Sequence, residues 1–301
     1  MPNLGDLFRD LGFDVPEKKP EPPKRKPDVH PANEIYLPND TAGLMQSSVG
    51  ETCDNLALGL NKLKLLKQIR RDKKTEQITS WKFGFPDRDQ RVAIPGKTAE
   101  LLREINKAND ALPHTSSLPL TTASRIVVGL GGATVYETGM TMHHIYGVPY
   151  IPGSSVKGVC RHWVVQEYFE NDENYALKCK KFRTAFGFQQ GEEGARGNVI
   201  FFDAFPVKLR GLERDIMNPH FGNYYKNAGK PSKNSMNLPT DDMSPVPIFF
   251  LAVPAQTNFQ FYLQNGELEL RGKSVKDHLR DALTESGIGA KTALGYGLFK
   301  E

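Results

Sequence analysis

The sequence is poor in cysteine and in long apolar runs. Its three cysteines (Cys53, Cys160 and Cys179) form no CxxC pair, which argues against a disulfide scaffold or a zinc ribbon and favours a reducing compartment. No apolar run approaches the roughly 20 residues that a membrane-spanning helix needs. The start of the chain also lacks the charged and apolar regions of a signal peptide. We therefore expect a cytoplasmic protein with no membrane partner.

Excess charge is also scarce, because 39 basic and 35 acidic side chains leave a net charge of only +4. This balance excludes a highly basic coating protein but still favours an anionic partner. RNA binding is compatible with it if the positive charge gathers on one face. Apolar residues at 39% and charged residues at 25% are typical of a globular protein with a real core.

The first third of the chain predicts an arm followed by helices. Residues 1–38 are dense in proline and charge from residue 16 onward, which predicts a flexible arm. Its basic cluster Lys24–Lys26 is either a solvated tail or an RNA contact. Residues 39–115 are expected to form a helical elaboration. The domain of interest is then 116–301.

Two helices are predicted within 39–115. Four leucines from Leu56 to Leu66 recur at steps of four, three and three, a helical period. Between residues 61 and 74 there are seven basic side chains and one acid. These belong either to a solvated helix end, stabilised by the helix dipole, or to a patch that contacts phosphates. A second helix is expected over 97–110.

After residue 119 the pattern becomes mixed α+β. Strands are expected at 121–130, 198–202, 246–253, 258–263 and 295–300. One helix should begin at Ser154 or Ser155, and another at Ser274, with Asp277 in a capping box and Gly287 at its end. The order β-α-β-β-α-β with one extra strand is the ferredoxin-like pattern that RRM-type RNA binders also use. The loop of about 40 residues near 200–246 is long enough to indicate a functional insertion.

The glycine-rich segment 287–297 (GIGAKTALGYG) joins the last helix to the last strand. Its glycines allow close backbone approach and positive φ, and Lys291 and Thr292 add a cation and a hydroxyl suited to a phosphate. The spacing and the helix-to-strand order exclude a Walker A loop and a Rossmann fingerprint. Taken alone, a loop of this kind is normally a glycine-rich bend without a ligand.

A second block, residues 150–161 (YIPGSSVKGVCR), places hydroxyls, backbone donors and a helix N-terminus together. Such a helix start favours an anion. Lys157 and Arg161 are four residues apart and share one helical face. The alternative is an ordinary capped helix with exposed basic residues.

The pair of blocks 151–158 (IPGSSVKG) and 287–297 resembles the signature of the RAMP superfamily of CRISPR-associated proteins. The segment 215–225 (DIMNPHFGNYY), with 239–242 and 246–249, is similar to the sixth-subunit family of type III-B (Cmr) effector complexes. The resemblance spans about residues 120–301 and uses three separated blocks in the right order.

The resemblance implies a ferredoxin-like (RRM-like) RAMP fold with a long central insertion. It further implies a non-catalytic, structural subunit that binds guide (CRISPR) RNA and caps the backbone filament near the 3′ part of that RNA. The implied partners are guide RNA, target RNA in the complex, and other Cmr subunits including the repeated backbone subunit. No cofactor and no metal are expected. Carried over to this chain, the RNA-facing helix start holds Ser154, Ser155, Lys157 and Arg161, and the adjacent glycine-rich loop holds Gly289, Lys291 and Thr292.

The histidines leave alternatives open. His220, near Asp215 and Tyr224, either belongs to an acid–base set for RNA cleavage or contacts RNA while tyrosines stack on bases; we assign His220 and Tyr224 to RNA binding. His143 and His144 follow the first strand near Glu137, where relatives sometimes carry nuclease residues.

Adjacent histidines usually point in different directions, so joint metal binding is not expected at His143 and His144. The alternatives to a structural subunit are a metal-independent endoribonuclease that processes guide RNA and a pure protein–protein adaptor.

Overall fold

The computed structural model describes residues 55–61, 66–71, 78–83, 92, 94–132, 134, 138–221 and 245–301. The predicted arm over 1–38 with its cluster Lys24–Lys26 lies outside the described residues, as do Glu137, Tyr224 and segment 239–242.

The helices are α3 (Leu56–Asn61), α4 (Thr98–Asp110), α5 (Gly153–Tyr168), α6 (Glu173–Lys178), α7 (Lys180–Phe186), α9 (Val275–Glu285) and the 3-10 turn η2 (Thr292–Leu294). The strands are β1 (Leu66–Arg71), β2 (Ile78–Phe83), β3 (Thr115–Thr122), β4 (Gly187–Gln190), β5 (Glu193–Arg196), β6 (Ile200–Phe201), β7 (Phe205–Pro206), β8 (Glu213–Met217), β9 (Ile248–Ala252), β10 (Asn258–Gln264), β11 (Glu269–Leu270), β12 (Lys273–Ser274) and β13 (Phe299–Lys300). The mixed α+β class is confirmed.

The main sheet is antiparallel and has the order β13-β3-β10-β6, with β7 also paired to β10. Strand β10 is central and pairs with β3 along its whole length, from Asn258 opposite Thr121 to Gln264 opposite Thr115. Its alternating side chains Phe259, Phe261 and Leu263 are buried in the main core, as a period of two predicts. Strand β10 therefore forms where the sequence places it.

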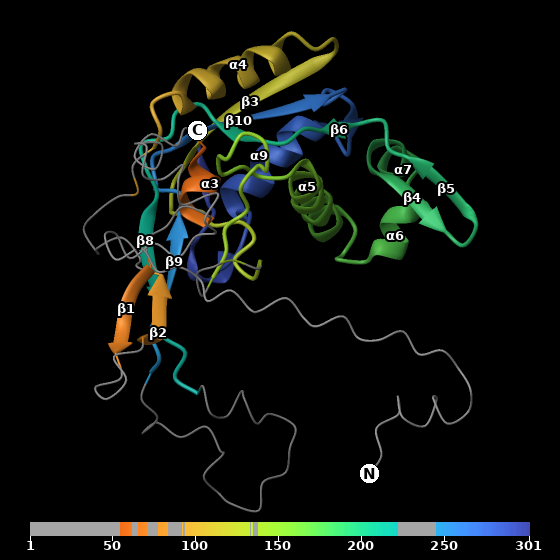
Figure 1. Ribbon diagram of the computed structural model, residues 1–301. Coiled ribbons are helices and arrows are strands. Elements are labelled where there is room, and N and C mark those ends of the chain that lie inside the picture. Colours follow the sequence, from red (N-terminus) through yellow and green to blue (C-terminus); the bar gives the residue numbers. More distant parts are fainter. Residues whose placement is uncertain are drawn as a thin grey trace, which may run out of the picture.

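Helices cover both faces of this sheet. Figure 1 shows α5 and α9 packed side by side below β3 and β10, while α4 lies across the opposite face. On the α4 side, Leu102 is fully buried and the Tyr262 hydroxyl donates to the Asn106 carbonyl oxygen at 3.0 Å. Helices thus pack on both faces of the sheet, although Ser117 and Pro119 of β3 stay exposed on the α4 side.

The start of α9 follows its predicted capping box. The Ser274 hydroxyl accepts from the Asp277 backbone N–H at 3.1 Å and donates to the Asp277 carboxylate at 2.7 Å. After the helix, Gly287 adopts φ +73°, the left-handed conformation expected of a helix-ending glycine. Both ends of α9 were therefore encoded locally.

The predicted helix over 55–66 is wrong in its second half. Helix α3 ends at Asn61, and Leu66 begins β1, which pairs antiparallel with β2. Leu56 and Leu60 are buried in the core, which explains the first helical turn. Pairing with a strand about ten residues away overrides the continuing leucine period. The basic residues of 66–71 lie in a strand, so the helix-dipole argument does not apply to them.

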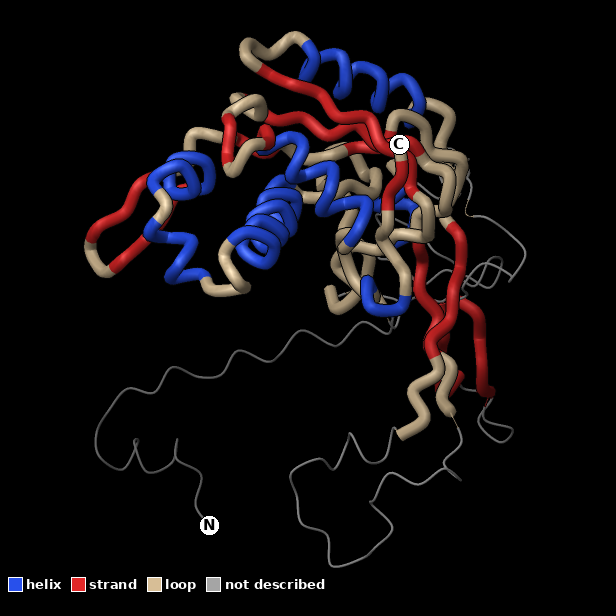
Figure 2. Tube along the Cα trace, turned by 180° about the vertical axis from the view of Figure 1, so that it is seen from behind, coloured by secondary structure: helices blue, strands red, loops and turns tan. Residues whose placement is uncertain are grey.

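Two other predicted segments are shifted or divided. The expected strand over 121–130 is instead β3, which ends at Thr122, and Ile126 forms only an isolated bridge to Val253. The expected long loop near 200–246 contains β7 and β8, and β8 pairs with β9 in a separate two-stranded sheet. Figures 1 and 2 show β8–β9 and β1–β2 at one end of the molecule, opposite the β4–β5 hairpin. Among the described residues, no helix is long and apolar enough to cross a membrane.

Candidate nucleic-acid interface

Helix α5 begins at Gly153, and neither predicted serine caps it. Pro152 occupies the N-cap position, and the Gly153 backbone N–H donates to Asp203 Oδ1 at 2.7 Å. A Cβ on residue 153 would lie 2.3 Å from the Phe201 carbonyl oxygen, so this first turn packs too closely on β6 for any other residue. Because a carboxylate of the chain already binds the first N–H of α5, this helix start is less suited to a phosphate than its sequence indicates.

Ser154 and Ser155 lie in the first turn of α5, with Ser154 exposed and Ser155 half-buried. One turn further, Lys157 is half-buried. Its partial burial lowers its pKa, and the positive charges of Arg161 and Arg196 lower it further. Neither Lys157 nor Arg196 forms an ion pair with another residue in the part of the chain that the structure describes. This group is therefore a local concentration of positive charge.

Arg161 plays a different part from Lys157. Its guanidinium pairs with Glu173 at 2.7 Å and lies 5.1 Å from the centre of the Phe182 ring. Through these contacts Arg161 ties α5 to α6 and α7. Lys157 is the cation of the predicted pair that has no acidic partner among the described residues.

The glycine-rich loop uses most of its backbone donors internally. The N–H groups that donate to backbone carbonyls belong to Gly287, Ile288, Ala290, Leu294, Gly295, Tyr296 and Gly297. A Cβ on Gly289, at φ +102°, would lie 2.5 Å from the Val127 carbonyl oxygen. What the loop offers to a ligand is therefore the half-buried side chains of Lys291 and Thr292 more than a row of free N–H groups.

Lys291 is held in place by aromatic rings. It has φ +65°, and its Nζ lies 5.1 Å from the centre of the Phe250 ring and 5.9 Å from that of Tyr296. These cation–π contacts fix the direction of the lysine side chain.

A polar network then joins the loop to β8. The Tyr296 hydroxyl donates to Asp215 Oδ2 at 2.5 Å, and Arg125 contacts Asp215 at 2.9 Å and Glu213 at 3.0 Å. Burial raises the pKa of Asp215, but its hydrogen bonds to Tyr296 and Ile216 and the charge of Arg125 outweigh burial, so the net pKa is lowered. The Asp215 carboxylate is thus the charged anchor of the loop.

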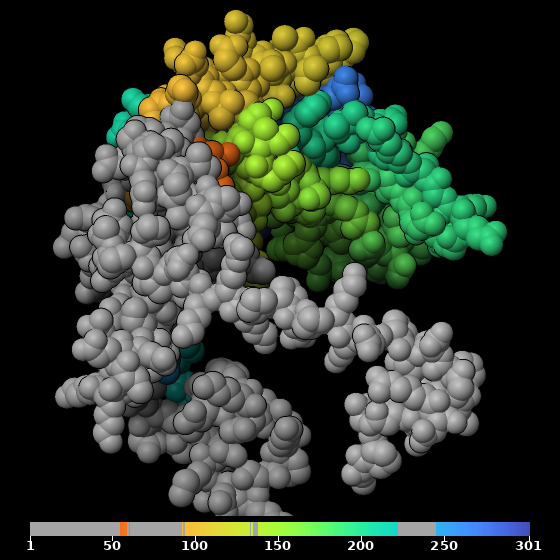
Figure 3. All heavy atoms as spheres, viewed as in Figure 1, coloured from red at the N-terminus to blue at the C-terminus, as the bar shows by residue number. Residues whose placement is uncertain are grey.

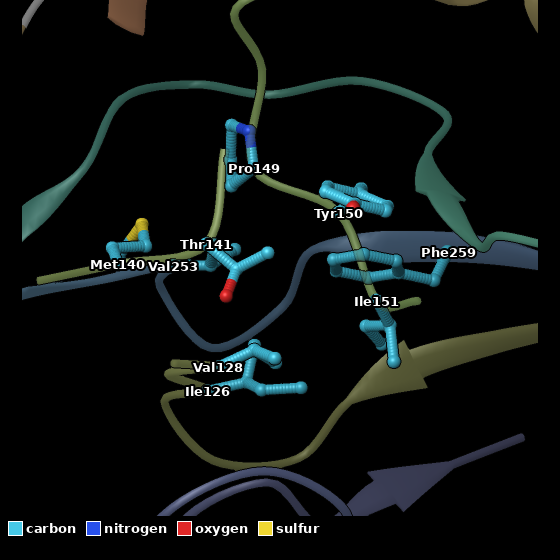
Figure 4. A pocket seen from close by; sticks show the side chains of 9 residues that line it. All are labelled: Ile126, Val128, Met140, Thr141, Pro149, Tyr150, Ile151, Val253 and Phe259. Carbon is cyan, nitrogen blue, oxygen red and sulfur yellow. The ribbon is translucent and has the colours of Figure 1, made fainter. Parts of the chain in front are cut away.

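Residues 126–128 lie between the two sequence blocks and contact both of them. Val127 packs with Phe250 and, through its carbonyl, accepts from the Ala290 N–H of the loop at 2.8 Å. Ile126 and Val128 instead face Ile151 across a small cavity of about 10 Å³, room for about one water. Figure 4 shows these side chains lining the cavity together with Tyr150. Residues 126–128 thus link the two blocks: Val127 contacts the side of the glycine-rich loop, and Ile126 and Val128 contact the side of Ile151.

His143 and His144 point the same way, contrary to the expectation from their adjacency. Their ring centres are 5.2 Å apart with planes 23° apart, and His143 also stacks on Tyr146 at 4.3 Å. Partial burial lowers the pKa of His143, as does the neighbouring His144 ring, while Asp203 opposes the shift. In the described part of the chain, no group of three or more side chains could hold a metal ion.

His220 is exposed, and its ring centre lies 6.4 Å from that of Phe221. Asp215, the carboxylate proposed as its acid–base partner, bonds instead to Arg125 and Tyr296. Tyr224 lies outside the described residues. His220 and Asp215 therefore do not form the suggested acid–base pair in the part of the chain that the structure describes.

Four residues of this region escaped the sequence analysis: Arg125, Asp203, Arg196 and Tyr296. Asp203 meets Gly153 across 50 residues, Arg125 meets Asp215 across 90, and Tyr296 meets Asp215 across 81. No local pattern marks such partners, because each acquires its role only when the chain folds.

Comparison with known proteins defines the class first. The family model of the RAMP superfamily matches residues 119–300, and the chain belongs to this superfamily. The "CRISPR system Cmr subunit Cmr6" of Pyrococcus furiosus is 33% identical over 265 residues, which cover 71% of this chain and 76% of that relative. Within the superfamily, the chain is therefore a member of the Cmr6 family.

A second relative and a solved structure are also similar to this chain. The Cmr6 subunit of Saccharolobus solfataricus is 25% identical over 186 residues, covering 60% of this chain and 56% of that protein. The match thus spans a little over half the length of that relative. The crystal structure of Cmr6 from Pyrococcus furiosus is 32% identical and covers 63% of this chain and 99% of that chain, with a TM-score of 0.33.

Proposed function

We propose that this protein is a non-catalytic, guide-RNA-binding structural subunit of a type III-B CRISPR (Cmr) RNA-targeting effector complex. In this role it caps the backbone filament near the 3′ part of the guide RNA. Membership of the Cmr6 family carries the assignment to the complex. The observation that carries RNA binding is Lys157, which lies beside Arg161 and Arg196 and has no acidic partner among the described residues.

The strand order supports a finer assignment of the fold, to a ferredoxin-like unit. In that reading β3, β6–β7, β10 and β13 are its four strands, and α5 and α9 are its two helices. Their order in the sheet, β13-β3-β10-β6, alternates the two halves of the chain as a double β-α-β unit requires. Helix α4 then adds a cover on the face that RRM-type proteins leave open.

One observation supports a non-catalytic role: the carboxylate nearest in sequence to His220 is bound by Arg125 and Tyr296. The stacked pair His143 and His144 favours the competing function, a metal-independent endoribonuclease. Incubation of the purified protein with labelled repeat RNA in EDTA separates the two. Sequence-specific cleavage that disappears in His144→Ala or His220→Ala would replace the structural role by the enzymatic one.

The salt dependence of RNA binding tests the site. For single-stranded RNA, log K falls linearly with log salt, and each lost phosphate contact lowers the steepness of that decline by about 0.7. Lys157→Ala and Lys291→Ala should each lower it by that amount, and the double variant by about twice as much, because the residues lie on opposite sides of 126–128. Lys276→Ala, whose cation already pairs with Glu267, is the matched control. Equal slopes in all variants would refute the site.

The place in the complex needs its own test. Photo-crosslinking of the assembled complex, carrying guide RNA with a single reactive nucleotide at successive positions, should crosslink this chain only in the 3′ half of the guide. Crosslinks confined to the 5′ half would contradict the capping role, and no crosslink at any position would favour a pure protein–protein adaptor.

A further inference from the structure

A second pocket, outside both sequence blocks, lies between α6, α7 and the β11–β12 turn. Its volume is about 440 Å³, within the range of roughly 300–1,000 Å³ that is typical of small-ligand sites. Six of its nine lining residues carry a charge, a phenol or a thiol, namely Tyr175, Lys178, Cys179, Lys181, Glu269 and Arg271. The pocket is therefore large enough for one nucleotide and is not simply an apolar gap in the core.

The charge of the lining favours an anion. Lys178, Lys181 and Arg271 supply three positive charges against one negative charge from Glu269, a net charge of +2 (3 − 1). Glu269 pairs with Lys181 at 3.2 Å, but both side chains are more than half exposed. Solvent screens such a pair, so an incoming phosphate can compete with Glu269 for the lysine.

Aromatic rings form the floor and one side of the pocket. Phe169 is fully buried, and Tyr175 meets it edge to face at 5.5 Å with an interplanar angle of 84°. Tyr175 itself is 42% exposed. The fold leaves much of this ring uncovered beside three cations, the combination on which single-stranded nucleic acids stack.

Arg271 is placed by a conformation that arginine seldom adopts. It has φ +55° and is followed by Gly272 at φ +84° in the two-residue turn between β11 and β12, a position where asparagine or glycine is usual. The strained backbone sets the guanidinium 4.6 Å from the centre of the Phe169 ring. Stacked in this way, the planar group directs its N–H donors outward in its own plane, and no hydrogen bond from them is found among the described residues.

We propose that this pocket binds one nucleotide of single-stranded RNA, with the base against Tyr175 and the phosphate between Arg271 and Lys178. The choice of RNA as the ligand rests on the proposed function; the cationic and aromatic character of the site does not. An acidic peptide would satisfy the cations but offers no flat π face for Tyr175. The pocket is joined to the predicted site through Arg161 of α5, which pairs with Glu173 at the start of α6.

Substitutions at the pocket test this with a fluorescent oligo-uridine RNA and the full-length chain. Tyr175→Ala should raise the Kd about five- to a hundredfold, the usual effect of removing one stacked base. Lys178→Ala and Arg271→Asn, in which asparagine tolerates the left-handed backbone, should each lower the salt slope by about 0.7. Lys180→Ala removes an exposed lysine of α7 outside the lining and should leave both values unchanged. Thermal unfolding verifies that each variant is folded.

Alkylation of Cys179 provides a readout at the pocket itself. Cys179 lines the pocket and is half-buried, whereas Cys160 is fully buried. Saturating oligo-uridine should slow alkylation of Cys179 at least severalfold, both in the wild type and in Lys157→Ala, and poly-glutamate should not. If RNA binds with a Lys157-dependent slope yet Cys179 reacts at an unchanged rate, the pocket proposal fails while the proposed function stands. Protection by poly-glutamate alone would make the pocket a protein-docking site, and a chain that binds no RNA at all would overturn both proposals.

Discussion

Removing the Tyr296 hydroxyl should loosen the glycine-rich loop without disturbing the core. In Tyr296→Phe the ring remains beside Phe250 and Lys291, and only the hydrogen bond to Asp215 disappears. A hydrogen bond to a charged group contributes roughly 1.5–3 kcal/mol. Asp215 keeps its contact with Arg125, so no buried charge is left without a partner. We therefore expect a loss near the lower end, about 1.5 kcal/mol of unfolding free energy at pH 7.

The effect should depend on pH in a defined direction. The pKa of Asp215 is lowered in the fold, although burial by itself raises it. A carboxylate with a depressed pKa contributes stability above its unfolded pKa, about 3.9, and that stability is lost as the pH falls through the folded pKa. The difference between wild type and Tyr296→Phe should thus be full at pH 6–7 and shrink below about pH 4.

Urea denaturation at several pH values measures this difference, through a lower midpoint at an unchanged m-value. Tyr150→Phe is the matched control, because no hydrogen bond from its hydroxyl is found among the described residues, and it should change the midpoint little. A Tyr296→Phe variant as stable as wild type at pH 7 would refute the anchoring role of Asp215. A difference that stays constant down to pH 3 would show that the charge of Asp215 is not involved.

Three further outcomes are expected. Gly297→Ala should lower the free energy of unfolding, measured in urea, by about 2–4 kcal/mol, because residue 297 has φ +74° and its Cβ would lie 2.0 Å from a backbone oxygen. Gly158→Ala should instead raise it by about 0.5–1 kcal/mol, because residue 158 is a helical site with open space around it. Cys160, whose pKa burial raises, should resist iodoacetamide in the folded protein while Cys179 reacts, as peptide mass spectrometry can measure. His278 is fully buried, and its pKa is lowered chiefly by burial. The free energy of unfolding should therefore decline as the pH falls below about 6.5, by up to about 1.4 kcal/mol per pH unit. In His278→Leu this decline should be less steep.

Local physics accounts for the parts of the fold that the sequence predicts well. The alternation of Phe259, Phe261 and Leu263 identifies β10, and the Ser274–Asp277 pair with Gly287 fixes both ends of α9. These signals act over two to four residues, so they survive in any tertiary context. The two motif blocks are likewise read from the sequence alone, and the family they indicate is confirmed.

Local signals fail where a distant partner decides. The leucine period predicts helix through Leu66, but pairing with β2 makes that residue a strand. The serines at the start of α5 predict a helix cap, but the Gly153 N–H donates to the Asp203 carboxylate instead. In both places the chain prefers a contact whose free energy depends on tertiary packing, which a local pattern does not contain.

The sequence by itself therefore determined the family, the α+β class and the basic and glycine-rich blocks expected at the RNA-binding surface. Only the tertiary structure decided what the cations of those blocks contact: Arg161 pairs with Glu173, Lys157 has no acidic partner among the described residues, and Lys291 lies over two aromatic rings. It also brought Tyr175 and Lys178 to Arg271, almost a hundred residues away. Charge and ring type are written in the sequence, but a binding site needs them within a few ångströms of one another, and only folding sets that distance.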